Sequence, residues 1–161
     1  MNTKHNRQDL HSFLSQHPSI HPERRAAAVP IMQALQKERG YLNDAAIEEV
    51  AHLTGLSTTE VEELATFYTL IYRYPVGRHV VQICDSVCCS IRGADELLVA
   101  AEKYSGVPLG AVTPNGALSV LPSICLGLCD RAPAALVDGE GLGPLNKVGL
   151  EALLRSLGEE D

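Results

Sequence analysis

The sequence predicts an α+β fold, with a small helical bundle over residues 1–76 and a mixed sheet covered by helices over residues 77–161. Three observations lead to this prediction. Apolar residues in the first part recur at the helical spacing of three and four residues. A turn-forming segment, Tyr74-Pro75-Val76-Gly77, ends that pattern. Beyond it, short apolar runs typical of strands alternate with further helical segments.

The first two expected helices lie before Gly40. A short opening helix is indicated by the apolar residues at positions 10–14. A second helix is expected from about residue 23 to residue 39, with Gly40 as a plausible C-cap. Pro30 lies inside this stretch, so the sequence predicts a kink or a helix start there.

Two more helices are expected between Gly40 and the turn. Asp44 is the predicted N-cap of the third helix, which ends at Gly55. Ser57 and Glu60 have the spacing of a capping box at the start of the fourth. The predicted apolar face of this fourth helix consists of Val61, Leu64, Ala65 and Tyr68.

The second part of the chain has a different order of elements. The expected order is a strand over 78–83, a helix over 94–101, a hairpin around Asn115-Gly116 joining 111–113 to 117–120, a strand over 134–138 and a helix over 150–157. A mixed sheet with helices packed on it is reminiscent of a small thioredoxin-like fold.

Composition excludes several functions. The net charge is −7, and both parts of the chain are acidic, so neither offers the basic patch that nucleic-acid binding needs. No apolar run is long enough to span a membrane, and the N-terminus lacks the apolar core of a signal peptide. We therefore expect a soluble, intracellular protein, where thiols stay reduced and metal ligation is favoured over disulfides.

Five cysteines form the most informative pattern. Cys84, Cys88 and Cys89 lie in one short segment, and Cys125 and Cys129 lie in another, with 35 residues between Cys89 and Cys125. The second pair has C-x3-C spacing. The first pair has C-x4-C spacing with Cys89 or C-x3-C spacing with Cys88, and spacing alone does not choose between them.

Two close pairs of thiolates suit an iron–sulfur cluster, because a [2Fe–2S] cluster needs two ligands for each iron. A structural zinc site held by four cysteines is the main alternative, although such sites usually contain a C-x2-C knuckle, which this chain lacks. The absence of C-x2-C also argues against a thioredoxin-type dithiol, and no histidine flanks a cysteine as a Rieske centre would require.

Four segments have a distinctive sequence: Ala-Thr-Phe-Tyr (65–68), Pro-Val-Gly-Arg-His-Val (75–80), Ile-Cys-Asp-Ser-Val-Cys-Cys (83–89) and Cys-Leu-Gly-Leu-Cys-Asp-Arg-Ala-Pro (125–133). They resemble the E subunit of NADH:quinone oxidoreductase, the 24 kDa flavoprotein subunit family of respiratory complex I. The resemblance extends over residues 20–157. It implies a helical bundle followed by a thioredoxin-like [2Fe–2S] ferredoxin domain.

The resemblance also implies a site. One [2Fe–2S] cluster would be held by four ligands, Cys84, Cys89, Cys125 and Cys129, with Gly93 at the family's glycine position. Cys88 then occupies a position that the family usually fills with a non-ligand. No catalytic residue is expected in this chain. We also expect a cis bond between Ala132 and Pro133, where thioredoxin-like proteins often place a cis-proline.

The function implied by the resemblance is electron transfer within NADH dehydrogenase. The flavin (FMN) and the NADH site would belong to the partner F subunit, and a larger iron–sulfur subunit of the peripheral arm would be a second partner. The chain would be cytoplasmic and held at the inner face of the cell membrane only through the complex. Two alternatives remain at this point: the equivalent subunit of an NAD-linked hydrogenase or formate dehydrogenase, and a zinc-stabilised interaction module.

Overall fold

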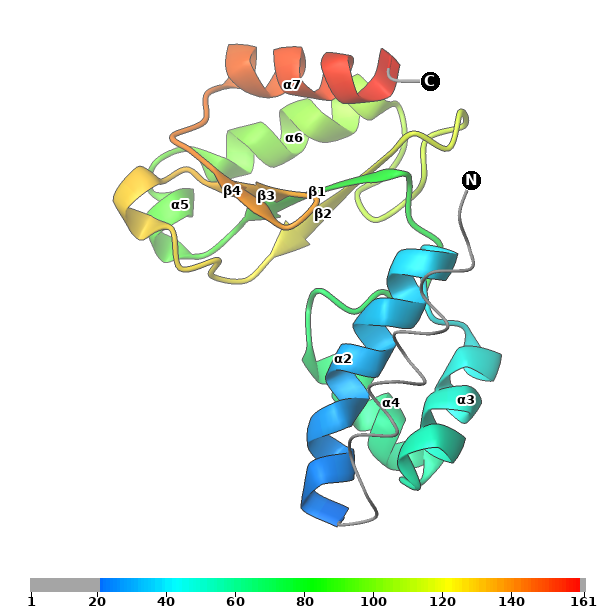
Figure 1. Cartoon of the computed structure of the whole chain (residues 1–161). Helices are drawn as coiled ribbons and strands as arrows, with labels where there is room; N and C mark the ends of the chain where they lie inside the picture. Colours follow the sequence, from blue (N-terminus) through cyan, green and yellow to red (C-terminus); the bar gives the residue numbers. More distant parts are fainter. Residues whose placement is uncertain (1–20, 160–161) are drawn as a thin grey trace. The chain divides into compact units, whose positions relative to one another are not determined.

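A computed structural model describes residues 21–159 of the chain. The chain divides into two compact units, Met1–Pro75 and Val76–Asp161. The first unit contains the helices α2 (His21–Arg39), α3 (Asp44–Thr54) and α4 (Thr58–Phe67), which pack against one another (Figure 1). Their facing sides form one apolar core, to which α2 contributes Ile31 and Met32.

Helix ends in the first unit follow from local sequence signals, with two corrections. Gly40 and Gly55 both follow helices as left-handed residues, as expected from their missing Cβ atoms. The N-cap of α3 is Asn43 and not Asp44, because the Asn43 side chain accepts the Ala46 N–H. Helix α2 begins well before Pro30 and runs through it, so Pro30 does not start a helix. The expected opening helix at positions 10–14 lies outside the described residues.

The capping box at the start of α4 is confirmed. The Ser57 hydroxyl accepts the Glu60 N–H at 3.3 Å, and the Glu60 carboxylate accepts the Ser57 N–H at 2.9 Å. Val61 and Ala65 are buried as the helical spacing predicts. The prediction fails for Tyr68, which lies beyond the last turn of the helix and is 42% exposed.

The second unit contains a four-stranded mixed sheet in the order β2-β1-β3-β4. Its strands are β1 (His79–Cys84), β2 (Leu118–Ser123), β3 (Ala135–Val137) and β4 (Glu140–Leu142). Strand β1 pairs in parallel with β2 and antiparallel with β3. The expected hairpin around residues 115–116 is reduced to one isolated bridge between Val112 and Ser119, so the segment before Asn115 is not a strand.

Helices α6 (Ala94–Ser105) and α7 (Lys147–Glu159) pack together and against the sheet, as Figure 1 shows. Alternation along β1 sends Val81 and Ile83 into the core beneath these helices. Cys84, the last residue of β1, belongs to a different buried group. The fold is therefore the predicted α+β arrangement. The first cysteine, Cys84, lies at the end of the inner strand β1.

Within the described part of the chain, none of the helices combines the length and the apolar character needed to cross a membrane.

Candidate metal centre

The first cysteine pair is built from the end of β1 and a one-turn helix, α5 (Val87–Ser90). Cys84 ends the strand, and Cys88 and Cys89 are successive residues of the helix. Successive helical side chains point about 100° apart, so both cannot face the same way. Cys89 is 1% exposed, whereas Cys88 is exposed to solvent. The helix therefore turns Cys89 inward, toward Cys84.

The second pair lies on the loop that follows β2. Cys125 and Cys129 have their sulfur atoms 3.9 Å apart. Gly127, between them, adopts a φ of +76°, which lets the loop turn tightly between the two cysteines. Cys129 opens the short 3₁₀-helix η1 (Cys129–Arg131), and both thiols are exposed.

The two loops meet at the sulfur atoms. The backbone N–H of Leu126, from the second loop, donates to the Cys84 sulfur, as does the N–H of Ser86 from the first. The Cys88 and Cys129 side chains share a hydrogen bond. The five cysteines of these two distant segments thus form one group, which lies where β1 ends at Cys84 and α5 begins.

Electrostatics differ between the two buried thiols. Burial works against the Cys84 thiolate, but the two backbone donors and the Cys89 thiol hold the pKa of Cys84 below the ordinary thiol value. Burial raises the pKa of Cys89, and the neighbouring Cys84 sulfur adds to this, while the Ala134 N–H opposes it. The Cys89 thiol therefore donates to the Cys84 sulfur, and Cys84 is the more acidic thiol of this pair.

The exposed thiols of Cys125 and Cys129 are also linked by a hydrogen bond. Hydrogen bonds with the sulfurs of Cys125 and Cys88 raise the pKa of Cys129 to about 11. Sulfur atoms this close cannot all become thiolates unless positive charge lies among them. Metal ions supply that charge, and thiols lose their protons when they bind metal.

Small apolar residues surround the buried pair. Ala94, Ala132 and Ala134 are buried with Cys84 and Cys89, and Leu126 and Leu128 pack against this group. The surroundings of the buried pair are therefore apolar. The Ala132–Pro133 bond that follows η1 is cis, which confirms that prediction.

The four predicted ligand residues come together as two pairs. Among the side chains that the structure describes, those of residues 25–159, no three His, Cys, Asp or Glu are arranged to hold a single metal ion. The backbone donors to the buried sulfurs belong to Ser86, Leu126 and Ala134. Nothing in the residue types marks these donors, because any non-proline residue has an N–H.

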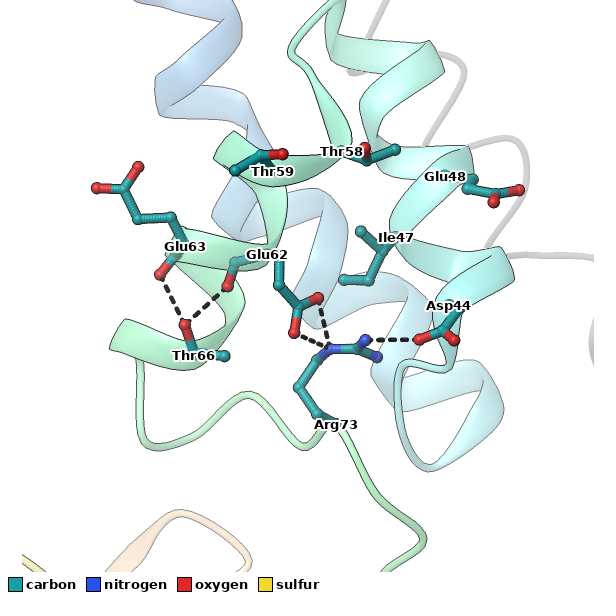
Figure 2. A pocket seen from close by; sticks show the side chains of 9 residues that line it. All are labelled: Asp44, Ile47, Glu48, Thr58, Thr59, Glu62, Glu63, Thr66 and Arg73. Atoms are coloured by element: carbon teal, nitrogen blue, oxygen red, sulfur yellow. Dashed lines mark hydrogen bonds and ion pairs between the residues drawn. The ribbon is translucent and has the colours of Figure 1, made fainter.

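A separate pocket lies in the first unit and contains no cysteine. It has a volume of about 510 Å³ and is lined mainly by residues of α3 and α4. Figure 2 shows the Arg73 guanidinium between the carboxylates of Glu62 and Asp44, to which it donates at 2.9 Å each. These pairs give Arg73 a structural role in holding α3 and α4 together.

Comparison with known proteins identifies the family. The thioredoxin-like [2Fe–2S] ferredoxin family matches residues 11–158. The E subunit of NADH-quinone oxidoreductase from Pseudomonas aeruginosa is 39% identical over 82% of this chain and 80% of that protein. An E subunit of the Rhizobium meliloti enzyme is 41% identical over 84% of this chain and 81% of that protein. The E subunit from Escherichia coli is 39% identical over 81% of this chain and 78% of that protein.

A solved structure shows the same fold in a longer chain. A crystal structure of an NAD+-reducing [NiFe]-hydrogenase in the H2-reduced state superposes with a TM-score of 0.68 and 26% identity. The match covers 81% of this chain but only 22% of that one. The resemblance to the E subunit of NADH:quinone oxidoreductase is thus confirmed at the level of family and fold. The chain belongs to the thioredoxin-like [2Fe–2S] ferredoxin family.

Proposed function

We propose that this chain is an electron-transfer subunit of an NADH-oxidising complex and holds one [2Fe–2S] cluster on Cys84, Cys89, Cys125 and Cys129. The cluster would exchange one electron at a time with the flavin of a partner subunit. The single observation that supports this most strongly is that the two loops, each carrying one cysteine pair, contact each other at the sulfur atoms in a chain of this family. We assign no catalytic residue to the chain.

The donor set fits such a cluster. Two thiolates on one tetrahedral metal ion with bonds of about 2.3 Å lie about 3.7 Å apart. The sulfur atoms of Cys125 and Cys129 are 3.9 Å apart, so this pair needs little movement to share one iron. Cys84 and Cys89, joined by a hydrogen bond, would share the other. Four sulfurs in two pairs suit two irons better than a single zinc ion.

The protein's contribution is to hold and shield the cluster, which supplies one-electron redox chemistry. The site has a total charge of about −2 when oxidised and about −3 when reduced, so donors to sulfur stabilise the reduced form. The N–H groups of Ser86, Leu126 and Ala134 already donate to the buried sulfurs. The alanines around Cys84 and Cys89 limit water on the inner side.

The partner is expected to be the flavin- and NADH-binding F subunit, together with the larger iron–sulfur subunit of the peripheral arm. The relatives are named as subunits of one oxidoreductase, and the matching segment of the hydrogenase is part of a much longer chain. Exposed apolar side chains next to the cysteines support a protein contact there. They are Val87, Ile91 and Ile124, which are 72%, 81% and 68% exposed.

A second contact would lie in the helical unit, which is also a candidate docking element. Phe67 and Tyr74 are 75% and 80% exposed there, and aromatic residues are enriched in protein interfaces. Through these partners the chain would lie at the cytoplasmic face of the membrane without contacting lipid.

The second candidate function is the equivalent subunit of an NAD-linked hydrogenase or formate dehydrogenase. The hydrogenase structure with the same fold supports it, and the cluster chemistry would be unchanged. Affinity purification of the chain from its native cells separates the two: we expect quinone-reductase subunits to co-purify, and a hydrogenase or a formate dehydrogenase would point to the alternative.

The central experiment is anaerobic purification followed by iron, zinc and sulfide analysis and EPR spectroscopy. We expect two irons and two acid-labile sulfides for each chain, a reddish-brown colour and an EPR signal after one-electron reduction. A colourless protein with one zinc would exclude the redox function and favour the zinc-stabilised module.

The partner surface has its own test. Ile91→Asp should weaken co-purification with the flavin subunit, because it places a charge on the exposed apolar residues beside the cysteines. Val148→Asp is the matched control, since Val148 is 76% exposed but lies on α7. Equal loss of the partner in both variants, or in neither, would count against this surface.

A further inference from the structure

One buried polar atom lacks a partner. Ser123 is 5% exposed, and its hydroxyl is the only buried side-chain nitrogen or oxygen among the described residues that makes no hydrogen bond. Buried hydroxyls in folded proteins are almost always bonded, because losing water without a new partner is unfavourable. An unpaired one therefore points to an acceptor that the protein alone does not supply.

Ser123 is positioned at the cysteine site. It is the last residue of β2 and pairs in register with Cys84, the last residue of β1. Register partners in a parallel pair place their side chains on the same face of the sheet. The backbone keeps this register through the Asp85 N–H, which donates to the Ser123 carbonyl oxygen at 2.9 Å. Cys125 follows two residues later on the same loop.

The Ser123 side chain lies on the same face of the sheet as the Cys84 sulfur. Val81 and Ile83 of β1 and Val120 of β2 point into the core beneath α6 and α7. Alternation then places Cys84 and Ser123 on the opposite face. Cys84 is buried there with Cys89. The acceptors expected near the hydroxyl are therefore sulfur atoms.

We propose that the Ser123 hydroxyl donates a hydrogen bond to a sulfur of the [2Fe–2S] site and raises the reduction potential of the cluster. This inference rests on the proposed function, because the acceptor is a sulfur that becomes fully anionic only when the cluster is bound. Reduction adds negative charge to the sulfurs, so a donor stabilises the reduced form more than the oxidised form. Unlike the backbone donors at the site, this donor can be removed by a side-chain substitution.

A matched control is present in the same strand. Ser119 is 1% exposed and lies on the same face as Ser123, four residues earlier. Its hydroxyl has both partners within the protein: it accepts the Gly77 N–H at 3.0 Å and donates to the Ala111 carbonyl at 3.1 Å. Removing it affects the packing of the unit but no donor to sulfur.

The test uses the full chain with its cluster and measures the reduction potential by EPR-monitored redox titration. We expect Ser123→Ala to shift the potential downward and Ser119→Ala to leave it unchanged. Ser123→Thr, which keeps the hydroxyl, should remain close to the unmodified protein. An unchanged potential in Ser123→Ala, an equal shift in Ser119→Ala, or a Ser123→Thr potential as low as that of Ser123→Ala would overturn the proposal.

Two further readouts separate this role from a structural one. Hyperfine spectra of the reduced cluster in H2O and D2O should lose one exchangeable proton coupling in Ser123→Ala, and retention of all couplings would contradict the proposal. Without the cluster, Ser123→Ala should be as stable as the unmodified chain, because no bond is lost, and a large destabilisation would indicate a structural bond instead. A chain that binds no [2Fe–2S] cluster at all would refute the proposed function, whereas a bound cluster indifferent to Ser123 would refute only this inference.

Discussion

The two adjacent cysteines at positions 88 and 89 have opposite environments, and this difference leads to a prediction about ligation. Cys89 is buried and donates to Cys84, whereas Cys88 is exposed and shares a hydrogen bond with Cys129. We expect Cys89→Ser to lose the cluster, because the iron shared by Cys84 and Cys89 would lack one of its two thiolates. Cys88→Ser should keep iron, sulfide and the EPR signal close to those of the unmodified protein.

The measurement for this pair is visible absorption with EPR, at equal protein concentration and after anaerobic reconstitution. The two variants control for each other, since each changes one neighbouring sulfur to oxygen. The reverse outcome would assign the ligand to Cys88 and would require α5 to rotate or unwind, since its single turn directs Cys89 inward.

Arg73 provides the second prediction at the scale of single residues. Its guanidinium donates to Glu62, to Asp44 and to the Leu42 carbonyl, and its side chain is only 15% exposed. These bonds to its partners raise the pKa of Arg73 although burial opposes this, so the charge is always present. Arg73→Met should lower the free energy of unfolding of the helical unit by about 2 kcal/mol, because hydrogen bonds to charged groups are lost.

Urea denaturation followed by circular dichroism measures this effect. Arg39→Met is the control, because Arg39 pairs with Glu49 at 2.7 Å on the surface, with both side chains more than a third exposed. Exposed pairs contribute only about 0.2–1 kcal/mol. Similar losses in both variants would show that Arg73 acts as an ordinary surface residue.

At the scale of elements, the sequence was most informative where local chemistry determines structure. Ser57 and Glu60 have the right spacing for a capping box and form one. Asn43 and Asp44 are both good N-caps in adjacent positions, so only the structure distinguishes them. The strand Glu140–Leu142 is short, exposed and contains glycine, and therefore has no apolar alternation to detect.

The candidate site also combines features that the sequence predicts with features that only the structure shows. Cysteine spacing indicates a metal site, but a single helical turn decides which of Cys88 and Cys89 points inward, and one turn leaves no periodic signal. The missing partner of the Ser123 hydroxyl is a property of the folded chain alone. Such features depend on strand register and burial, which arise from contacts between residues distant in the sequence.

The loop after β4 gives a prediction for the second cysteine loop. Gly143 packs against the carbonyl oxygen of Arg131, the last residue of η1, and an added Cβ would lie 3.2 Å from the Pro133 carbonyl oxygen. Gly143→Ala should therefore displace η1 and Cys129 and cost about 1–3 kcal/mol, the usual range for overpacking. We expect less iron retained for each chain after gel filtration.

Gly149→Ala is the control for this substitution. Gly149 lies in α7, where an added Cβ would meet only the Asn146 side-chain oxygen at 3.4 Å. Alanine favours a helix over glycine by about 1 kcal/mol, so this variant should be as stable as the unmodified chain or more so. Full iron retention in Gly143→Ala would show that the loop moves without disturbing Cys129.

The whole molecule has two separate apolar cores, and all five cysteines belong to one unit. The helices α2, α3 and α4 share one core, whereas the sheet, α6 and α7 share another. Cys84, Cys89, Cys125 and Cys129 lie in the unit Val76–Asp161. Within the protein the two cysteine loops are joined by a few hydrogen bonds and by the packing of Leu126 and Leu128 against the buried pair, so a cluster would add a covalent connection with two iron–sulfur bonds to each loop.

Hydrogen–deuterium exchange of the cluster-bound and cluster-free chains tests this organisation. Cluster removal should increase exchange in residues 84–91 and 123–134, because these loops lose their shared metal links and open more often. Protection in α3 and α4 should be unchanged, because their core contains no ligand. Loss of protection in those helices would mean that the cluster stabilises both units, and equal exchange in both forms would mean that the loops are ordered without it.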